Sequence, residues 1–521
     1  MTPSRLCAGL AALTLHVATA GAAAAQEREC RADGIGAATP AADAPVAILG
    51  ASVEALPGGG DRYCLVKVRV GGNVHIWIGL PMDGHWNGDL QAEGKGGYGG
   101  QLTPPVRSVA RGYVGVASDT GHPAAARDPT EEPTDDWRNT TGAFALRAPG
   151  VPDMALQNDF AHRSAHLMAV IAKQLAEAYY GRAAKYAYWN GCSTEGRQGL
   201  RAAQQYPDDY DGILAGDPAI SFAQVMAYQI WPQLVMKDMV GGPILPAKLA
   251  LATTRAVAAC DGRDGLADGI LTDPRQCRYR ARRDRSIVRA DCTATDATCL
   301  SRAEADAIDA IWRGPLAPDG TLLWRGIERG APLGLLAGKT PFPYAIVQPR
   351  YWVYRDPDWD WRTLTLESYP EFFAKSVASV NPIMAPNEPD LAPFFARGGK
   401  IMMYHGFNDS GILPHGSIDY YTAVARRTGM SLPRLQAHAR LYMFPGVGHC
   451  GGGDAPQPPV DRMLDALAGW VENGVPPRDL VAVQDGKGVI HSTRPICPYP
   501  TLPYYRGSGD PKLAASFVCR R

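Results

Sequence analysis

The sequence lacks two features: a net charge and, beyond its N-terminus, long apolar runs. Its 521 residues include 52 lysines and arginines and 52 aspartates and glutamates, so the formal net charge is zero. A zero net charge gives no basic footprint for nucleic acid or for an anionic membrane. No later stretch is long and apolar enough to span a bilayer. We therefore expect no nucleic-acid partner and no membrane partner, and the sequence indicates no particular oligomeric state.

Signatures of a zinc site and of a repeat protein are also missing. The chain has no Cys-x-x-Cys pair, which is a common spacing of zinc-binding cysteines. His162 and His166 stand one helical turn apart. The helix of a zinc peptidase also requires a glutamate between the two histidines, and none is present here. No segment repeats another. The sequence therefore predicts no zinc site.

The first 25 residues have the pattern of a secretory signal peptide. Arg5 supplies a short positive region, residues 6–20 are mostly apolar, and alanines at 23–25 offer a small-residue cleavage site. A membrane anchor is the alternative, but the apolar stretch is short and contains His16 and Thr19. We predict a secreted or periplasmic protein.

Removal of the signal peptide removes Cys7 and leaves ten of the 11 cysteines. An even number of cysteines in an exported chain favours disulfide bonds over free thiols. The ten are Cys30, Cys64, Cys192, Cys260, Cys277, Cys292, Cys299, Cys450, Cys497 and Cys519.

Strand and helix patterns alternate in two parts of the chain. Short β-rich runs occur at 74–81, 112–118, 185–190, 212–215, 400–404 and 440–444, and helical patterns at 155–180, 195–205, 417–427 and 460–472. Such alternation is typical of an α/β protein with a mostly parallel sheet. Between about 220 and 395 the periodicity breaks down, and this segment holds four cysteines, a basic run and many aromatic residues.

Ser193 stands where a predicted strand runs through Gly-Cys-Ser-Thr-Glu into a predicted helix. This setting exposes a nucleophilic serine above a sheet, although Glu195 replaces the last glycine of the Gly-x-Ser-x-Gly pattern. Serine needs an adjacent base, and His449, in a turn after a strand, is the best candidate. Asp409, at another strand end, would hold the imidazole in the right tautomer.

The alternative is a structural turn serine with an unrelated histidine and aspartate. Two cysteines argue against it, because Cys192 precedes Ser193 and Cys450 follows His449. The order Ser, Asp, His is that of an α/β-hydrolase. We therefore predict an α/β-hydrolase core (26–219 and 396–521) with a large inserted lid domain (220–395).

Backbone N–H groups are expected to stabilise the oxyanion of the tetrahedral intermediate. One would come from Thr194, directly after the nucleophile. The other would come from the glycine-rich segment 93–100, where Gly96 or Gly97 is the best choice. A flexible surface loop is the alternative interpretation of this segment.

An acidic, glycine-rich stretch at 260–273 spaces carboxylates as a calcium-binding loop does. Calcium takes six to eight oxygen ligands, which turns with glycine allow to converge. The stretch is not an EF-hand, because the spacing and the final glutamate are missing. A cluster of Asp-Gly turns without an ion is the alternative.

The Cys-Ser, Asp, His-Cys arrangement resembles the tannase and feruloyl esterase family, which also includes mono(2-hydroxyethyl) terephthalate hydrolase. The likeness covers nearly the whole mature chain. It implies an α/β-hydrolase core with a lid and five disulfides, which are Cys192–Cys450, Cys30–Cys64, Cys260–Cys277, Cys292–Cys299 and Cys497–Cys519. It also implies a structural Ca²⁺ in the lid, with Asp261, Asp264, Asp268 and the carbonyls of Leu266 and Ile270 as ligands.

The predicted function is a secreted serine carboxylic ester hydrolase that cleaves esters of aromatic acids through an acyl-enzyme. Its partner would be a small aromatic ester of the feruloyl, galloyl or terephthalate type. A secreted peptidase or an acyltransferase could use the same triad, since the fold does not decide the substrate. A non-catalytic binding protein would require a lost triad member, and all three are present.

Aromatic residues of the predicted lid are candidates for an acyl pocket. We expect one or two of them to line the site and the others to form lid core. They are Trp324, Phe342, Tyr344, Tyr351, Trp352, Trp359 and Trp361. A substrate carboxylate would need an arginine, for which Arg350 and Arg362 are equal candidates. Asn139 begins a glycosylation sequon.

Overall fold

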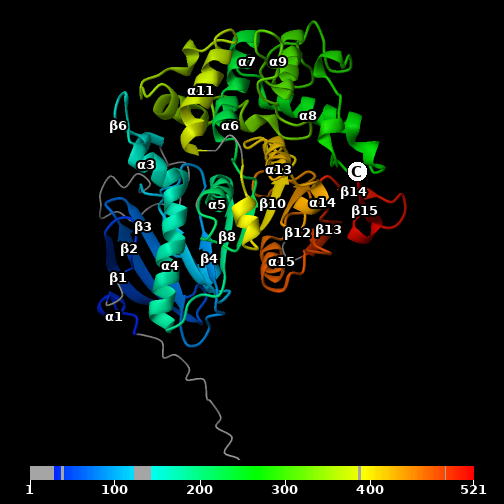
Figure 1. Cartoon of the computed structure of the whole chain (residues 1–521). Helices are drawn as coiled ribbons and strands as arrows, with labels where there is room; N and C mark the ends of the chain where they lie inside the picture. Colours follow the sequence, from blue (N-terminus) through cyan, green and yellow to red (C-terminus); the bar gives the residue numbers. More distant parts are fainter. Residues whose placement is uncertain (1–28, 37–39, 95, 123–141, 385–388, 487–488) are drawn as a thin grey trace, which may run out of the picture.

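A nine-stranded mixed sheet lies at the centre of the computed structural model, which describes residues 29–36, 40–94, 96–122, 142–384, 389–486 and 489–521 (Figure 1). In sheet order the strands are β1 (Val46–Ala55), β2 (Arg62–Val70), β3 (Val74–Pro81), β5 (Val114–Ser118), β4 (Leu90–Glu93), β8 (Ala187–Cys192), β9 (Gly212–Gly216), β10 (Lys400–Gly406) and β11 (Ala439–Phe444). Neighbours from β1 to β5 pair antiparallel. The strands from β5 to β11 run parallel.

Alternate residues of the parallel strands enter two apolar cores, one on each face of the sheet. Trp189 and Ile213 belong to the core shared with α4 (Ser164–Tyr180) and α5 (Thr194–Gln205). Tyr188 and Leu214 belong to the core shared with α15 (Val460–Asn473). Because successive side chains of a strand point to opposite faces, strands covered on both sides are apolar at nearly every position.

Short helices complete the part of the chain that surrounds the sheet. They are α1 (Ala32–Gly36), α2 (Val106–Val109), α3 (Met154–Asn158), α13 (His415–Arg427) and α14 (Leu432–Leu435). The single helix predicted over 155–180 is divided, since a wider helical turn at Asp159–Arg163 separates α3 from α4.

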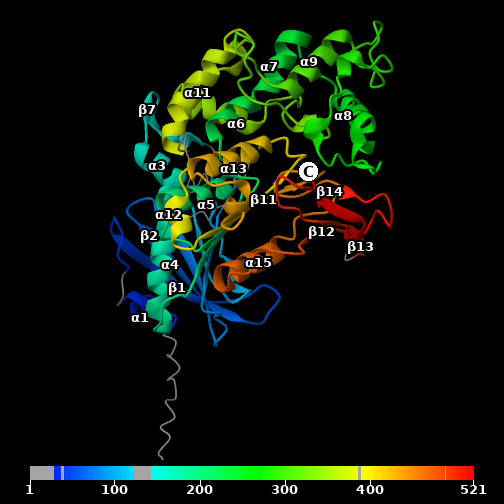
Figure 2. The ribbon, with the colours of Figure 1, turned by 45° about the vertical axis from the view of Figure 1, so that its right-hand side comes forward.

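Between β9 and β10 the chain forms a mostly helical layer, which we call the insertion (residues 217–399). Figures 1 and 2 show it above one edge of the sheet. Its helices are α6 (Phe222–Gln229), α7 (Trp231–Val240), α8 (Pro246–Cys260), α9 (Arg302–Arg313), α10 (Pro343–Gln348), α11 (Tyr369–Met384) and α12 (Ala392–Ala396). Phe222, Ile308 and Phe372 are among the residues of its own apolar core. The domain boundaries predicted at 219/220 and 395/396 stay a prediction.

In the part of the chain that the structure describes, three two-stranded sheets lie outside the central sheet. They are β6 (Leu146–Ala148) with β7 (Val151–Pro152), β12 (Val481–Gly486) with β13 (Val489–Pro495), and β14 (Leu502–Tyr505) with β15 (Phe517–Arg520).

All ten expected cysteines are paired in disulfides, in the pattern that the family resemblance implies. The pairs are Cys30–Cys64, Cys192–Cys450, Cys260–Cys277, Cys292–Cys299 and Cys497–Cys519. Disulfides in this number are typical of proteins that fold in an oxidising compartment. Within the described ranges, no helix combines the length and apolar character needed to cross a membrane. The predicted signal peptide (1–25) and the sequon at Asn139 lie outside the described residues.

Candidate active site

A strained turn presents Ser193 between β8 and α5. Ser193 has a φ of 67°, a conformation that costs free energy in any residue with a side chain. Backbone hydrogen bonds hold it there, because the Ser193 N–H donates to the Gly216 carbonyl at 2.8 Å and the Ser193 carbonyl accepts from Arg197 and Ala219. The strand, turn and helix thus have the form of a nucleophile elbow.

Glycines on either side of Glu195 allow the elbow to pack tightly. A Cβ at Gly196 would lie 2.5 Å from the carbonyl oxygen of Gly216, and a Cβ at Gly191 would lie 2.5 Å from the Cβ of Glu195. The close approach of α5 to β9 therefore depends on Gly196. The departure from the glycine pattern at Glu195 does not loosen this contact.

His449 and Asp409 form a hydrogen-bonded pair at the ends of two neighbouring strands. Asp409 follows β10, and His449 follows β11. The Nδ1 of His449 lies 2.6 Å from the Oδ2 of Asp409. The other carboxylate oxygen of Asp409 accepts the N–H groups of Gly411 and Ile412, each at 2.8 Å. Asp409 is fully buried. These hydrogen bonds therefore hold its carboxylate in position and stabilise its negative charge in place of water.

A second buried histidine and carboxylate lie behind this pair. The Nε2 of His405 is 3.3 Å from the Oδ2 of Asp409 and 3.6 Å from the Oδ1 of Asp217. Burial raises the pKa of Asp217 to about 6. Burial also opposes the charge of Asp409, but His449 and His405 hold the pKa of Asp409 below its ordinary value. The sequence patterns do not single out Asp217 or His405, although each closely follows a predicted strand.

A disulfide joins the turn of Ser193 to the turn of His449. Cys192 and Cys450 are bonded with their Cα atoms 5.9 Å apart, although 258 positions separate them in the chain. The bridge therefore links the residue before Ser193 to the residue after His449. It restricts the distance between the two turns directly.

Ser193 and His449 line one cavity of about 480 Å³. Thr194, Gly96 and Gly97 lie on its wall too. The hydroxyl of Thr194 donates to the Gly97 carbonyl at 2.6 Å, which ties the glycine-rich segment to the start of α5. The structure thus brings together all the residues predicted for nucleophile, base and oxyanion contacts, with Asp409 directly behind.

The insertion covers this cavity with apolar and aromatic side chains. Of the seven aromatic candidates, Phe342 and Tyr344 line the cavity. Trp352 is instead buried in the insertion core beside Phe144 and Phe160. The other insertion residues on the wall, which the sequence patterns do not indicate, are Met226, Gln229 and Leu335.

Neither arginine proposed for a substrate carboxylate lines the cavity. The Nε of Arg350 donates to the Trp359 carbonyl at 3.0 Å, and Arg362 pairs with Asp360 at 3.0 Å on the surface. Both expectations are therefore wrong. Among the described residues on the wall no arginine or lysine occurs, and the charged side chains are those of Glu195 and His449.

The loop predicted to bind calcium lies next to Cys260 in the insertion. The Oδ1 of Asp261 is buried and has no hydrogen-bond partner among the described residues. The Oδ2 of Asp264 accepts from the Thr272 hydroxyl at 2.6 Å, and the Oδ2 of Asp268 pairs with Arg494 at 2.5 Å. Burial raises the pKa of both Asp261 and Asp264. The donors are oxygens, as a hard cation requires.

The carboxylate oxygens of this loop do not form a close group of three among the described residues. Of the described residues, none from this loop belongs to a group of three ligand atoms that all lie within 4.8 Å of one another. Asp268 points to Arg494 rather than to Asp261. The type of donor and the unpartnered oxygen of Asp261 fit calcium, whereas the orientation of Asp268 does not.

Comparison with known proteins assigns the chain to a protein family. A family model described as tannase and feruloyl esterase matches residues 66–332 and 335–520. The chain belongs to the tannase and feruloyl esterase family. Membership of this family makes it a carboxylic ester hydrolase with an α/β-hydrolase fold.

Relatives in the tannase and feruloyl esterase family match over most of their length. A probable feruloyl esterase of Arthroderma benhamiae is 33% identical over 475 residues, which are 88% of this chain and 84% of that protein. The mono(2-hydroxyethyl) terephthalate hydrolase of Piscinibacter sakaiensis is 30% identical, with coverage of 90% and 86%. The crystal structure of feruloyl esterase B from Aspergillus oryzae superposes with a TM-score of 0.80 at 24% identity, covering 91% of this chain and 97% of that one.

Proposed function

We propose that this protein is an exported serine esterase that hydrolyses esters of aromatic carboxylic acids. The proposal rests on one observation: Ser193 and His449 line the same cavity as Phe342 and Tyr344. In this cavity Ser193 is held on a strained turn, and His449 is paired with Asp409. The names of the relatives, feruloyl esterase and terephthalate hydrolase, support an aromatic acyl group.

In this mechanism the Ser193 hydroxyl attacks the ester carbon and passes its proton to the Nε2 of His449. Asp409 keeps the Nδ1 proton of the imidazole in place through its 2.6 Å hydrogen bond and stabilises the cation that forms. His449 then protonates the leaving alcohol. In the second half, water attacks the acyl carbon and gives a proton to His449, which returns a proton to the Ser193 oxygen as the bond to the acyl group breaks and the acid leaves. The backbone N–H groups of Thr194 and of Gly96 or Gly97 would bind the oxyanion.

Substrate selectivity is expected to come from the insertion, because the triad contacts only the ester group. Phe342 and Tyr344 offer flat apolar surfaces for an aromatic ring. We expect methyl esters of aromatic acids to be hydrolysed with a kcat/KM at least about tenfold higher than p-nitrophenyl esters of long fatty acids. Steady-state kinetics with both series measures this ratio. A preference for long aliphatic acyl groups would overturn the aromatic assignment and favour a lipase.

Phe342→Ala provides a sharper version of the same test. Loss of the ring is expected to reduce kcat/KM for aromatic esters by about tenfold and to affect short acetyl esters less, because only the aromatic acyl group contacts it. Phe372→Leu, in the core of the insertion, is the matched control for general loosening of this layer. An equal loss for both ester types would contradict a role of Phe342 in acyl recognition.

His449 gives the proposed reaction a pH dependence of defined sign. Burial lowers the pKa of His449, but the charge and hydrogen bond of Asp409 raise it to about 9. Only a neutral imidazole can accept the Ser193 proton, so kcat/KM is expected to increase as the pH rises through this pKa. In Asp409→Asn the rate should fall and the midpoint should move to lower pH. Identical midpoints in both pH–rate profiles would contradict this role of Asp409.

We also propose that the loop at 261–270 binds a structural Ca²⁺. Asp261, Asp264, Asp268 and the carbonyls of Leu266 and Ile270 would hold it, with Asp268 leaving Arg494. The ion would offset the charge of carboxylates that are partly withdrawn from water. It would supply no chemistry to the ester, because none of these residues lines the cavity of Ser193.

Removal of calcium is expected to destabilise the protein before it changes the ester chemistry. Treatment with EGTA should lower the melting temperature by roughly 5 °C, because an ion that binds only the folded state stabilises it by mass action. Asp264→Asn should show the same loss without EGTA, whereas Asp291→Asn, at an exposed aspartate in the same insertion, should not. An unchanged melting curve with no calcium in elemental analysis would favour the turn cluster without an ion.

A further inference from the structure

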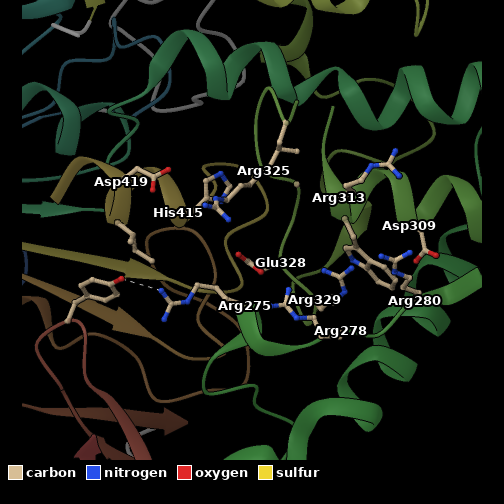
Figure 3. A pocket seen from close by; sticks show the side chains of 15 residues that line it. Arg275, Arg278, Arg280, Asp309, Arg313, Arg325, Glu328, Arg329, His415 and Asp419 are labelled. Atoms are coloured by element: carbon tan, nitrogen blue, oxygen red, sulfur yellow. Dashed lines mark hydrogen bonds between the residues drawn. The ribbon is translucent and has the colours of Figure 1, made fainter. Parts of the chain in front are cut away.

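A second cavity, of about 490 Å³, lies where the insertion meets α13. It shares no lining residue with the cavity of Ser193. The insertion contributes six arginines to its wall, and the rest of the chain contributes His415, Ile418, Asp419 and Tyr499. The six arginines are all labelled in Figure 3. They are Arg275, Arg278, Arg280, Arg313, Arg325 and Arg329.

Two of these arginines are held rigidly by the protein. Arg275 forms a two-pronged pair with Asp273, with distances of 2.7 and 2.9 Å. The Nε of Arg329 donates to the Tyr279 carbonyl at 2.8 Å, and its guanidinium lies 5.4 Å from the centre of the Trp312 ring. Their orientation toward the cavity is therefore fixed before any ligand arrives.

The other four arginines are exposed and form no close ion pair among the described residues, although Asp309 attracts the charge of Arg280, and Asp419 and Glu328 attract that of Arg325. Within the described part of the chain, neither a carboxylate ion pair nor a side-chain hydrogen bond is formed by Arg278, Arg280, Arg313 or Arg325. Figure 3 shows Arg278 and Arg280 near Arg329, Arg313 near Asp309, and Arg325 near His415. Guanidinium groups are planar forks that match the oxygens of carboxylate and phosphate.

The carboxylates on the wall do not balance this charge. Three of them, Asp309, Glu328 and Asp419, face five arginines besides Arg275, whose charge Asp273 balances. Asp309 accepts the backbone N–H groups of Ala281 and Arg282 at 2.8 and 3.2 Å, so it holds the turn that follows Arg280. Burial raises the pKa of Glu328 to about 7, which further reduces the negative charge at neutral pH.

A buried histidine gives a second, independent indication of a ligand. His415 is 3% exposed, and neither of its ring nitrogens has a hydrogen-bond partner in the described structure. Burial lowers the pKa of His415 to about 3, so the ring is neutral and offers one donor and one acceptor. Figure 3 shows it at the wall beside Arg325. A buried polar atom without a hydrogen-bond partner destabilises the folded protein, and a bound ligand would supply partners for both ring nitrogens.

We infer that this cavity binds a small organic anion that carries two or more carboxylate or phosphate groups. A single acid group can pair with about two guanidinium forks, so four arginines without a close ion pair call for more than one acid group. The volume falls within the range of small-molecule sites, which is about 300–1,000 Å³, and far exceeds the size of one inorganic ion. Trp312 and Tyr499 provide flat walls for the body of the molecule.

Isothermal titration calorimetry with two probes tests this inference. The tricarboxylate trimesate and the diphosphate pyrophosphate represent the two acid types, and acetate at equal ionic strength is the control ligand. We expect at least one probe to bind the full-length protein with one molecule per chain. The variant Arg280→Gln/Arg325→Gln should bind it about a hundredfold more weakly, at about tenfold for each lost fork.

A matched variant controls for the loss of charge itself. Arg283 and Arg285 are exposed residues of the same basic run but do not line the cavity, so Arg283→Gln/Arg285→Gln should retain the affinity. Ester hydrolysis should be unchanged in both variants, which shows that they are folded. Binding of only one probe supports the inference and identifies the acid type. The inference is overturned if neither probe binds, if acetate competes equally, or if the two variants lose the same affinity.

Discussion

Ser193→Ala is expected to lower kcat/KM for aromatic esters by at least about a thousandfold while the fold is retained. The hydroxyl is the proposed nucleophile, and no other serine lines its cavity among the described residues. His449→Ala should cause a loss of similar size. Because nucleophile and base act as one unit, the double variant should lose little more than either single variant. Steady-state kinetics of the three variants measures these effects.

Two substitutions elsewhere serve as controls for this result. Ser221 precedes α6 and makes no capping hydrogen bond with its side chain. His438 packs against Phe395 and does not line the cavity. Ser221→Ala and His438→Ala should both retain activity within a few-fold. Substantial turnover by Ser193→Ala would exclude the serine mechanism outright.

Removal of the Cys192–Cys450 bridge is expected to cause the largest loss of stability. The bridge closes a loop of 258 positions, for which chain-entropy reasoning gives about 5 kcal/mol in the free energy of unfolding. Cys192→Ser/Cys450→Ser should also lower kcat, because the bridge limits the distance between the turns of Ser193 and His449. Denaturant unfolding and kinetics on the same preparation measure both effects.

The Cys292–Cys299 bridge is the matched control for that experiment. It spans only 7 positions in the insertion, so the same reasoning gives about 2 kcal/mol, and no effect on kcat is expected. If both double variants lost the same activity, the bridge beside Ser193 would have no special role in the active site.

The core of the fold could be predicted because its strands and helices carry clear periodicities. The helix predicted over 460–472 is α15 (Val460–Asn473), and the strand predicted over 212–215 is β9 (Gly212–Gly216). The helices of the insertion were missed. Those such as α6 and α7 are buried on most sides, for example at Tyr228 and Leu234, so they show no polar face from which a helical period can be read.

The site divides in the same way. The proximity of Ser193, Asp409 and His449 could be predicted, because each follows a strand and parallel strands bring such ends together at one end of the sheet. Their catalytic roles stay a prediction. The arginine cavity could not be predicted, because its residues come from loops and helices between 275 and 329 whose relative position depends on the fold of the insertion. From the basic run at 278–289, only Arg278 and Arg280 reach the cavity.

The pattern of disulfides also determines the outcome of a proteolytic cut in the insertion. Four of the five bridges join cysteines that lie within 34 positions of each other, so a single cut between Cys299 and Cys450 separates none of those pairs. Such a cut leaves two fragments with one covalent link, the Cys192–Cys450 bridge. The nicked enzyme would migrate as one species until it is reduced, and Ser193 would stay tethered to His449. A cut in the insertion therefore leaves the covalent link between the turns of Ser193 and His449 intact.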